Sequence, residues 1–245
     1  IYVHIMKKKE KIILSDEIIL NELKSLVNRM KKAIHQKHNN YEKDVIDPFM
    51  SFFEQVIFKD NLEDWKESEY RRQLSKTFGN HLGRFHQNLL CSLDDCYEPE
   101  EGGVDFVSEN KKIIAEIKNK WNTTNAGSKA ASFDILRKAL SEKKYKGYKA
   151  YFVTIIPKTP KNYCEEFKTT SNVKKANYRK PRKDILSINA EYFYEKITGK
   201  KDVLKSIFYR LPELIKKLKY ADDELINNIT QHKDYNYFLD KALKD

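Results

Sequence analysis

The spacing of the apolar residues changes abruptly after Gly103, and this change limits the chain to folds that combine helices with a β-sheet. Residues 15–93 repeat their apolar side chains at helical spacing. The segments VDFVS and KKIIAEIK, which follow from Val104 to Lys118, are short and rich in β-branched residues, and only Glu109 and Asn110 separate them. This is the pattern of a β-hairpin. We therefore expect an α/β fold.

Three helices are predicted before the hairpin. Ser15 can cap the first, the second begins at Pro48 and covers PFMSFFEQVIF, and the third covers about residues 62–93. Because glycine weakens a helix interior, Gly79 and Gly83 predict an interruption in the third helix.

The rest of the chain predicts a further helix at 128–146, the strand YKAYFVTIIP, a basic loop, the strand DILSIN, and the helix AEYFYEKITG closed by Gly199. Helical spacing continues to the end. This order indicates a central mixed β-sheet flanked by helices, with helical N- and C-terminal additions. We divide the chain into a helical N-terminal region (1–77), a core (78–199) and a helical C-terminal extension (200–245), all within one compact domain.

The length and the cysteines limit the class of protein. A chain of 245 residues with 40% hydrophobic residues can build one large core. No apolar run approaches the roughly 18 residues of a membrane span, and no secretory signal is evident. Cys91, Cys96 and Cys164 lack the paired spacing of a disulfide framework or a zinc site. We expect a cytoplasmic protein without a membrane partner, in which residues 1–5, before Met6, are an upstream remnant.

The charge is strongly positive and unevenly distributed. A formal net charge of +11 indicates a polyanionic partner. Residues 158–183 hold nine Lys or Arg and two acids, whereas residues 94–109 hold seven acids and no base. Carboxylates for a cation, surrounded by lysines for phosphate, suit a metal-dependent nuclease. The alternative for residues 94–101 is a solvated acidic loop.

The predicted hairpin brings two acids and a lysine together. Side chains alternate along a strand, so Glu116 and Lys118 point the same way, and Asp105 lies on the partner strand. Two converging carboxylates can hold Mg²⁺, with the main-chain carbonyl of Ile117 as a further ligand. Lys118 can orient or deprotonate an attacking water and offset charge in the transition state.

The tripeptide Glu-x-Lys alone is weak evidence, because the chain contains five, beginning at Glu22, Glu109, Glu116, Glu142 and Glu166. A surface ion pair is the usual explanation for such a tripeptide. The one at Glu116 differs because it combines a strand pattern, an apolar opposite face and a preceding Gly-Gly-x-Asp strand. This context favours a metal site.

Val104-Asp105 followed by Glu116-Ile117-Lys118 resembles the motif of the PD-(D/E)XK nuclease superfamily, which includes most type II restriction endonucleases. The resemblance implies a restriction-endonuclease-like core in which Asp105, Glu116 and Lys118 are catalytic. It also implies that Asp105, Glu116 and the Ile117 carbonyl hold the metal. Val104 stands where the superfamily often has proline.

Three further segments, GNHLGRFHQNLL, EIKNKWNTTNAGSK and DILSINAEYFYEKITG, resemble the SinI-like type II enzymes that cut GGWCC or GGNCC sites. They fall between about residues 78 and 199. In several superfamily members a glutamate on the preceding helix assists the metal. The equivalent face here offers His86 and Gln87 as helpers, although a core or capping role for His86 fits equally well.

Two segments are predicted to contact DNA. Asparagine suits adenine edges, and lysine or arginine suits guanine acceptors. Residues 119–129 follow the catalytic strand, and residues 171–184 form the basic loop. The candidate contacts are Lys120, Asn122, Thr123, Asn125, Lys129, Tyr178, Arg179 and Arg182. The alternatives are a flexible turn with Ser128 as a helix cap, and phosphate contacts without base reading.

These features predict a type II restriction endonuclease, a hydrolase that uses Mg²⁺ to cut double-stranded DNA at a short palindromic site. A palindrome implies a two-fold homodimer, and a restriction-modification system implies a cognate DNA methyltransferase as a genetic partner. Two alternatives remain open. One is a structure-specific nuclease of repair or recombination, and the other is a DNA-binding protein in which the three site residues form structural ion pairs.

Overall fold

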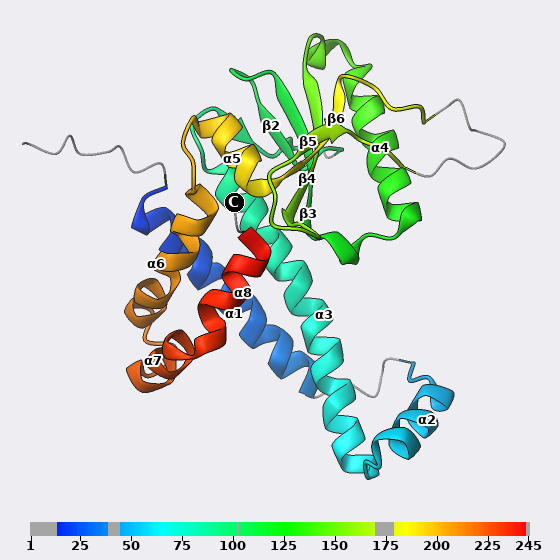
Figure 1. The fold of residues 1–245 in the computed structure, drawn as a ribbon, viewed down its shortest axis with the longest axis vertical. Helices are drawn as coiled ribbons and strands as arrows, with labels where there is room; N and C mark the ends of the chain where they lie inside the picture. Colours follow the sequence, from blue (N-terminus) through cyan, green and yellow to red (C-terminus); the bar gives the residue numbers. More distant parts are fainter. Residues whose placement is uncertain (1–13, 39–44, 102, 170–178, 244–245) are drawn as a thin grey trace, which may run out of the picture.

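A six-stranded mixed sheet forms the centre of the structure, and helices cover both of its faces (Figure 1). The computed structural model describes residues 14–38, 45–101, 103–169 and 179–243. These residues form eight α-helices: α1 (Asp16–His38), α2 (Pro48–Phe58), α3 (Leu62–Cys91), α4 (Ala126–Leu140), α5 (Ala190–Thr198), α6 (Val203–Lys217), α7 (Asp223–Gln231) and α8 (Lys233–Leu243). The predicted α/β class is confirmed.

The strand order of the sheet is β1-β2-β3-β4-β6-β5. The bounds are β1 (Cys96–Tyr97), β2 (Phe106–Ser108), β3 (Ile113–Lys120), β4 (Lys149–Ile156), β5 (Cys164–Glu166) and β6 (Ile185–Asn189). Strands β2 and β3 form the predicted antiparallel hairpin, and β3, β4 and β6 are parallel. The outer strands β1 and β5 were not predicted, because two or three residues carry too little periodicity to be recognised.

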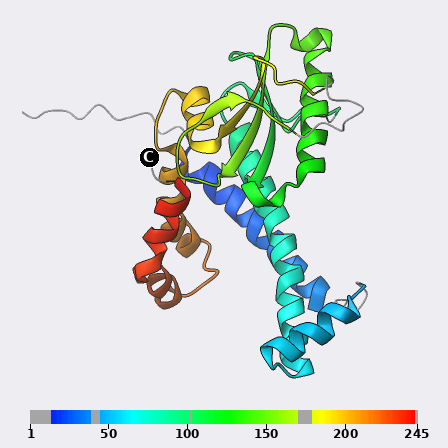
Figure 2. The same ribbon diagram turned by 45° about the vertical axis from the view of Figure 1, so that its right-hand side comes forward.

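The two faces of the sheet have separate cores, and helices lie on both sides of the sheet (Figures 1 and 2). Helix α4 covers one face, where Phe133 and Leu136 pack on Ile114 and Phe152. Helices α3 and α5 cover the other face, and α1, α6 and α8 extend that core away from the sheet. On the α4 side, Lys118 of β3 and Ser187 of β6 are partly exposed, whereas Glu116 and Thr154 are buried.

The N-terminal helices begin where their capping residues predict. Ser15 Oγ accepts from the Ile18 amide at 3.2 Å, and Asp47 caps α2 ahead of Pro48. The predicted interruption of the third helix is wrong, because α3 is continuous through Gly79 and Gly83. A glycine costs a helix only about 1 kcal/mol, which the packing of α3 against α1 and β3 offsets. Helix α3 therefore crosses the boundary that we placed at residue 78.

Helix α4 differs from its predicted range of 128–146. It begins at Ala126, because the side chain of Asn125, not Ser128, caps it by accepting from the Ser128 amide at 2.8 Å. It ends at Leu140, and a short 3-10 helix follows (Lys143–Tyr145). Gly199 closes α5 in the left-handed conformation, as predicted. None of the helices in the described residues is both long and apolar enough to cross a membrane.

Candidate active site

Asp105 is fixed by two main-chain groups and by the side chain of Gln87. Gly103, with φ of 103°, turns the chain in a conformation that glycine adopts readily, two residues before Asp105. The Asp105 amide donates to the Ala115 carbonyl at 2.9 Å, and Oδ2 of Asp105 accepts from the Ile117 amide at 2.7 Å. Gln87 of α3 donates to the Asp105 carbonyl at 3.0 Å. The carboxylate is therefore held at the point where β2 begins.

Glu116 and Lys118 point from β3 to the same side, as alternation predicts. Lys118 Nζ lies 3.0 Å from Glu116 Oε2 and 3.6 Å from Asp105 Oδ2. On α4, the Ser132 hydroxyl donates to Glu116 Oε2 at 3.3 Å. The three residues predicted to be catalytic therefore meet at one place.

Burial and neighbouring charges explain the directions in which the pKa values of Glu116 and Lys118 shift. The Glu116 side chain is only 4% exposed, while those of Asp105 and Lys118 are 29% exposed. Burial, reinforced by the negative charge of Asp105, raises the pKa of Glu116, although Lys118 and Ser132 act in the opposite direction. Burial alone would lower the pKa of Lys118, but attraction to both acids outweighs it and raises that pKa. A buried acid beside another acid favours the presence of a cation.

The donor atoms fit a hard divalent cation. Among the described residues, Oδ1 of Asp105 and Oε1 of Glu116 accept no hydrogen bond. In a strand the amide and carbonyl of one residue face the same side, so the Ile117 carbonyl faces Asp105, beyond the end of β2. Two carboxylates and a carbonyl are oxygen ligands of the kind that Mg²⁺ takes together with water. The described residues contain no group of three or more His, Cys, Asp or Glu that could hold a metal.

A cleft of about 620 Å³ opens beside these residues, between α3 and the end of β3. Asp105, Ile117 and Lys118 line one wall. The α3 wall carries Lys76, Asn80, Arg84 and Gln87, which sequence reasoning missed except for Gln87. Their spacing of four, four and three residues follows one helix face, and this polar stripe was the signal that could have revealed them.

The candidate DNA-contacting residues that follow β3 lie in different surroundings. Asn122 and Thr123 lie in the 3-10 helix Trp121–Thr123, and Thr123 lines the cleft. Asn125 caps α4, so its side-chain oxygen is occupied by Ser128. Lys129 lines a neighbouring pocket on the α4 side, and Lys120 borders an apolar groove. The DNA contacts predicted for these residues stay predictions.

The two arginines predicted to read bases are both paired with acids in the structure. Arg179 Nη2 lies 2.6 Å from Asp134 of α4, and Arg182 Nη2 lies 2.6 Å from Asp184. Each forms a second hydrogen bond to the same carboxylate through Nε. Base reading by either arginine would require its pair to open. Tyr178 lies outside the described residues.

The two helper residues lie in different surroundings. Gln87 lines the cleft and contacts the Asp105 main chain. His86 borders the apolar groove near Phe85, and desolvation lowers its pKa to about 4. His86 is not among the residues that line the cleft.

Comparison with known proteins gives two kinds of match. A sequence model of the family described as "Eco47II restriction endonuclease" matches residues 12–219. The chain is 37% identical to "Type II restriction enzyme Eco47II" of Escherichia coli over 205 residues, which are 82% of this chain and 85% of that protein. It is 30% identical to "Type II restriction enzyme Sau96I" of Staphylococcus aureus over 207 residues, 81% of this chain and 77% of that protein.

Proposed function

Because this chain belongs to the Eco47II restriction endonuclease family, we propose that it is a type II restriction enzyme whose cutting of duplex DNA depends on Mg²⁺. The convergence of Asp105, Glu116 and Lys118 carries this proposal. Lys118 Nζ lies 3.0 Å from Glu116 and 3.6 Å from Asp105, and Asp105 and Lys118 line an open cleft. The target is a short palindrome, with a GGNCC-like site as the working hypothesis.

Each residue has a role that follows from its position. Asp105, Glu116 and the Ile117 carbonyl would hold the metal ion, which supplies Lewis-acid activation of water and of the phosphate when bound. Ser132 keeps the Glu116 carboxylate oriented. Lys118 can orient the attacking water, and its ammonium group offsets the charge that develops on the phosphate.

We also assign the chain to the PD-(D/E)XK superfamily. The support is that one hairpin carries both acids and that β3, with Glu116 and Lys118, pairs in parallel with β4. Two copies, one for each strand of a palindrome, would form the active enzyme. A DNA methyltransferase that protects the same site would be its genetic partner, and both would act in the cytoplasm.

The test is cleavage of plasmid DNA by the purified chain with Mg²⁺. Discrete fragments, whose ends are then sequenced, are the expected product, and chelation of the metal should stop the reaction. Products only from nicked or branched DNA would instead indicate a structure-specific nuclease. Salt-sensitive binding without cutting would indicate a DNA-binding protein.

The Lys118→Ala variant tests the role of the lysine. We expect cleavage to fall by at least about 100-fold, because one preorganised charge donor at a reacting centre contributes about that much. Binding of DNA should be retained. Lys111→Ala is the matched control, because Lys111 belongs to another Glu-x-Lys, in the hairpin turn. This variant should cut DNA normally. Normal cutting by Lys118→Ala would refute the assigned role.

A further inference from the structure

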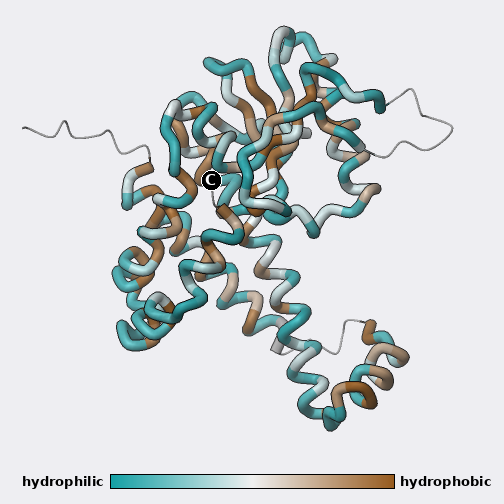
Figure 3. The backbone as a smooth tube through the Cα atoms, viewed as in Figure 1, coloured by the Kyte–Doolittle hydropathy of each residue, from teal (hydrophilic) through white to brown (hydrophobic). Residues whose placement is uncertain are grey.

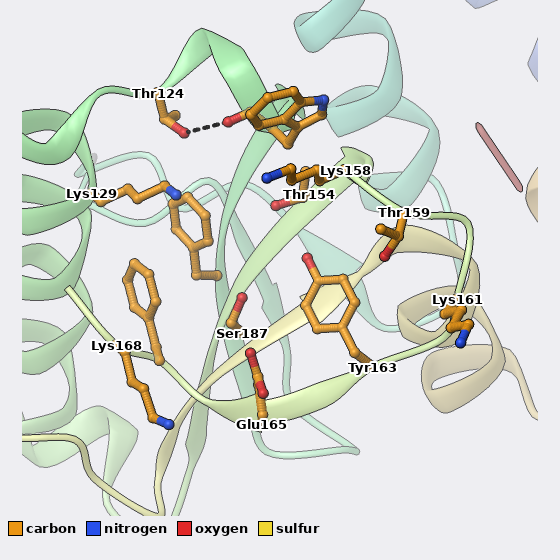
Figure 4. A pocket seen from close by; sticks show the side chains of 13 residues that line it. Thr124, Lys129, Thr154, Lys158, Thr159, Lys161, Tyr163, Glu165, Lys168 and Ser187 are labelled. Carbon is orange, nitrogen blue, oxygen red and sulfur yellow. Dashed lines mark hydrogen bonds between the residues drawn. The ribbon is translucent and has the colours of Figure 1, made fainter. Parts of the chain in front are cut away.

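A second pocket lies on the same face of the sheet as Glu116, towards the strand β5 (Figure 4). Its volume is about 420 Å³. Across the strands, Glu116 is paired with Phe152, Phe152 with Ser187, and Ser187 with Glu165. Side chains of directly paired residues share a face, so Glu165 faces the same side as the catalytic carboxylate. Three strand spacings separate them, about 14 Å.

The pocket is basic apart from one acid. Lys129, Lys158, Lys161 and Lys168 line it together with Glu165. None of the residues that the structure describes forms a hydrogen bond or an ion pair with the exposed Glu165 side chain. Thr124 lines both this pocket and the catalytic cleft, so the two are adjacent. A DNA strand at the catalytic residues would therefore extend over the lysines.

A carboxylate on this basic surface is repelled by DNA phosphates. Its favourable partner in DNA is a hydrogen-bond donor on a base. Cytosine presents only an amino donor in the major groove, whereas adenine presents the acceptor N7 beside its amino group. We propose that Glu165 determines specificity by accepting a hydrogen bond from a cytosine N4 amino group, while the surrounding lysines bind phosphates. The distance of about 14 Å from Glu116 equals roughly four base-pair steps. This inference rests on the proposed function.

The test compares Glu165→Ala with Glu166→Ala. Glu166 is the next residue on β5 and is paired with Leu186, so it points to the opposite face. Cleavage is measured on the mapped target and on duplexes that each have one base pair changed. For Glu165→Ala we expect discrimination at one C·G pair of each half-site to fall by about 10- to 100-fold. Glu166→Ala should discriminate as the unmodified chain does.

The remaining outcomes separate this inference from the proposed function. Unchanged discrimination with normal cutting would make Glu165 only a counter-charge for the lysines. An equal loss on every duplex would make its role structural. If the unmodified chain cuts no DNA, the proposed function fails. A preferred site would then be selected from random duplexes by binding without metal, and the affinities of its single-pair variants would still show whether Glu165 selects a cytosine.

A different observation concerns helix α2, which lies at the end of α3 far from the sheet (Figures 1 and 2). No residue of α2 is buried, although its sequence is strongly apolar (Figure 3). Its polar residues Ser51, Glu54 and Gln55 are the half-buried ones, and an exposed apolar patch of this kind usually marks an interaction surface. Its exposed large apolar side chains are Phe49, Met50, Phe52, Phe53, Val56, Ile57 and Phe58.

We infer that a second copy of this chain covers α2, with the two helices related by a two-fold axis. The four phenylalanines, each 56–73% exposed, present on the order of 500 Å² of apolar area. With the three aliphatic side chains the surface approaches the roughly 800 Å² that each partner contributes to a stable interface. Two chains of charge +11 repel each other, but α2 carries no Lys or Arg, so it is a place where they can meet.

Sedimentation of the full chain, with and without substitutions of equal exposure, tests this interface. Phe58 in α2 and Phe238 in α8 are both 66% exposed. We expect the unmodified chain and Phe238→Glu to sediment as dimers at micromolar concentration, and Phe58→Glu to sediment as a monomer. A monomeric unmodified chain, or a dimeric Phe58→Glu, would overturn the inference. Binding of the unmodified monomer to neutral lipid vesicles, lost in Phe58→Glu, would assign α2 to a membrane surface instead.

Discussion

At the scale of single residues, the catalytic group is held by atoms that need not touch DNA. Asp105 is fixed through the amide of Ile117 and the side chain of Gln87, and Glu116 through the hydroxyl of Ser132. Long, flexible side chains cannot fix the position of a metal site by themselves. In this chain the hairpin and the two flanking helices α3 and α4 share that task, so substitutions one contact away from the site should affect cleavage.

Gln87→Leu tests this arrangement. The substitution leaves only the weak Cys91 thiol, at 3.7 Å, to donate to the Asp105 carbonyl, and the loss of the stronger hydrogen bond costs about 1 kcal/mol of stability. We expect a lower melting temperature and a cleavage rate reduced by about 10-fold, because Asp105 is less well positioned. Asn88→Leu is the control, since it removes a hydrogen bond from α3 to Glu22 of α1. The control should lower stability but not the cleavage rate per folded molecule. If both variants lowered that cleavage rate equally, Gln87 would have no positioning role.

At the scale of secondary structure, short sequence signals predicted the features that depend only on neighbouring residues. The hairpin, the start of α2 at Pro48 and the Gly199 cap all follow from a few neighbouring residues, and the structure confirms them. The continuity of α3 could not be predicted, because it depends on packing against α1 and β3. The start of α4 was misplaced because Asn125 and Ser128 are both good caps, and only the observed hydrogen bond distinguishes them.

Two glycine substitutions test these explanations, one for the continuity of α3 and one for the end of α5. A methyl group at Gly79 would meet no atom within 4 Å, and the residue is helical. Gly79→Ala should therefore raise the free energy of unfolding by up to about 1 kcal/mol. Gly199 has φ of 71°, so Gly199→Ala should lower it by about 1–2 kcal/mol through backbone strain. Denaturant unfolding measures both, and a destabilised Gly79→Ala would mean that the glycine is needed in the cleft.

At the scale of the whole molecule, the sequence predicted which candidate catalytic residues lie together, but it did not predict the surroundings of the candidate DNA-contacting residues. Asp105, Glu116 and Lys118 lie within one hairpin, so strand alternation alone brought them together. The DNA surface depends on tertiary contacts instead. Arg179 is paired with Asp134, which is 45 residues away in the chain, and β5, which carries Glu165, was too short to recognise. The net charge could indicate a polyanion but not where it binds.

The pairing of Arg179 with Asp134 gives a prediction about DNA selectivity. If the guanidinium leaves Asp134 to bind a guanine, Arg179→Ala should weaken binding of the mapped target by about 10- to 100-fold more than binding of unrelated DNA. Asp134→Ala removes this pair together with one negative charge and should tighten binding to all DNA. Arg182→Ala, which breaks the pair with Asp184, provides the same comparison for the second arginine. Binding is measured across a range of salt concentrations without metal. An equal loss on every duplex, with a salt slope smaller by about one, would assign the arginine to a phosphate.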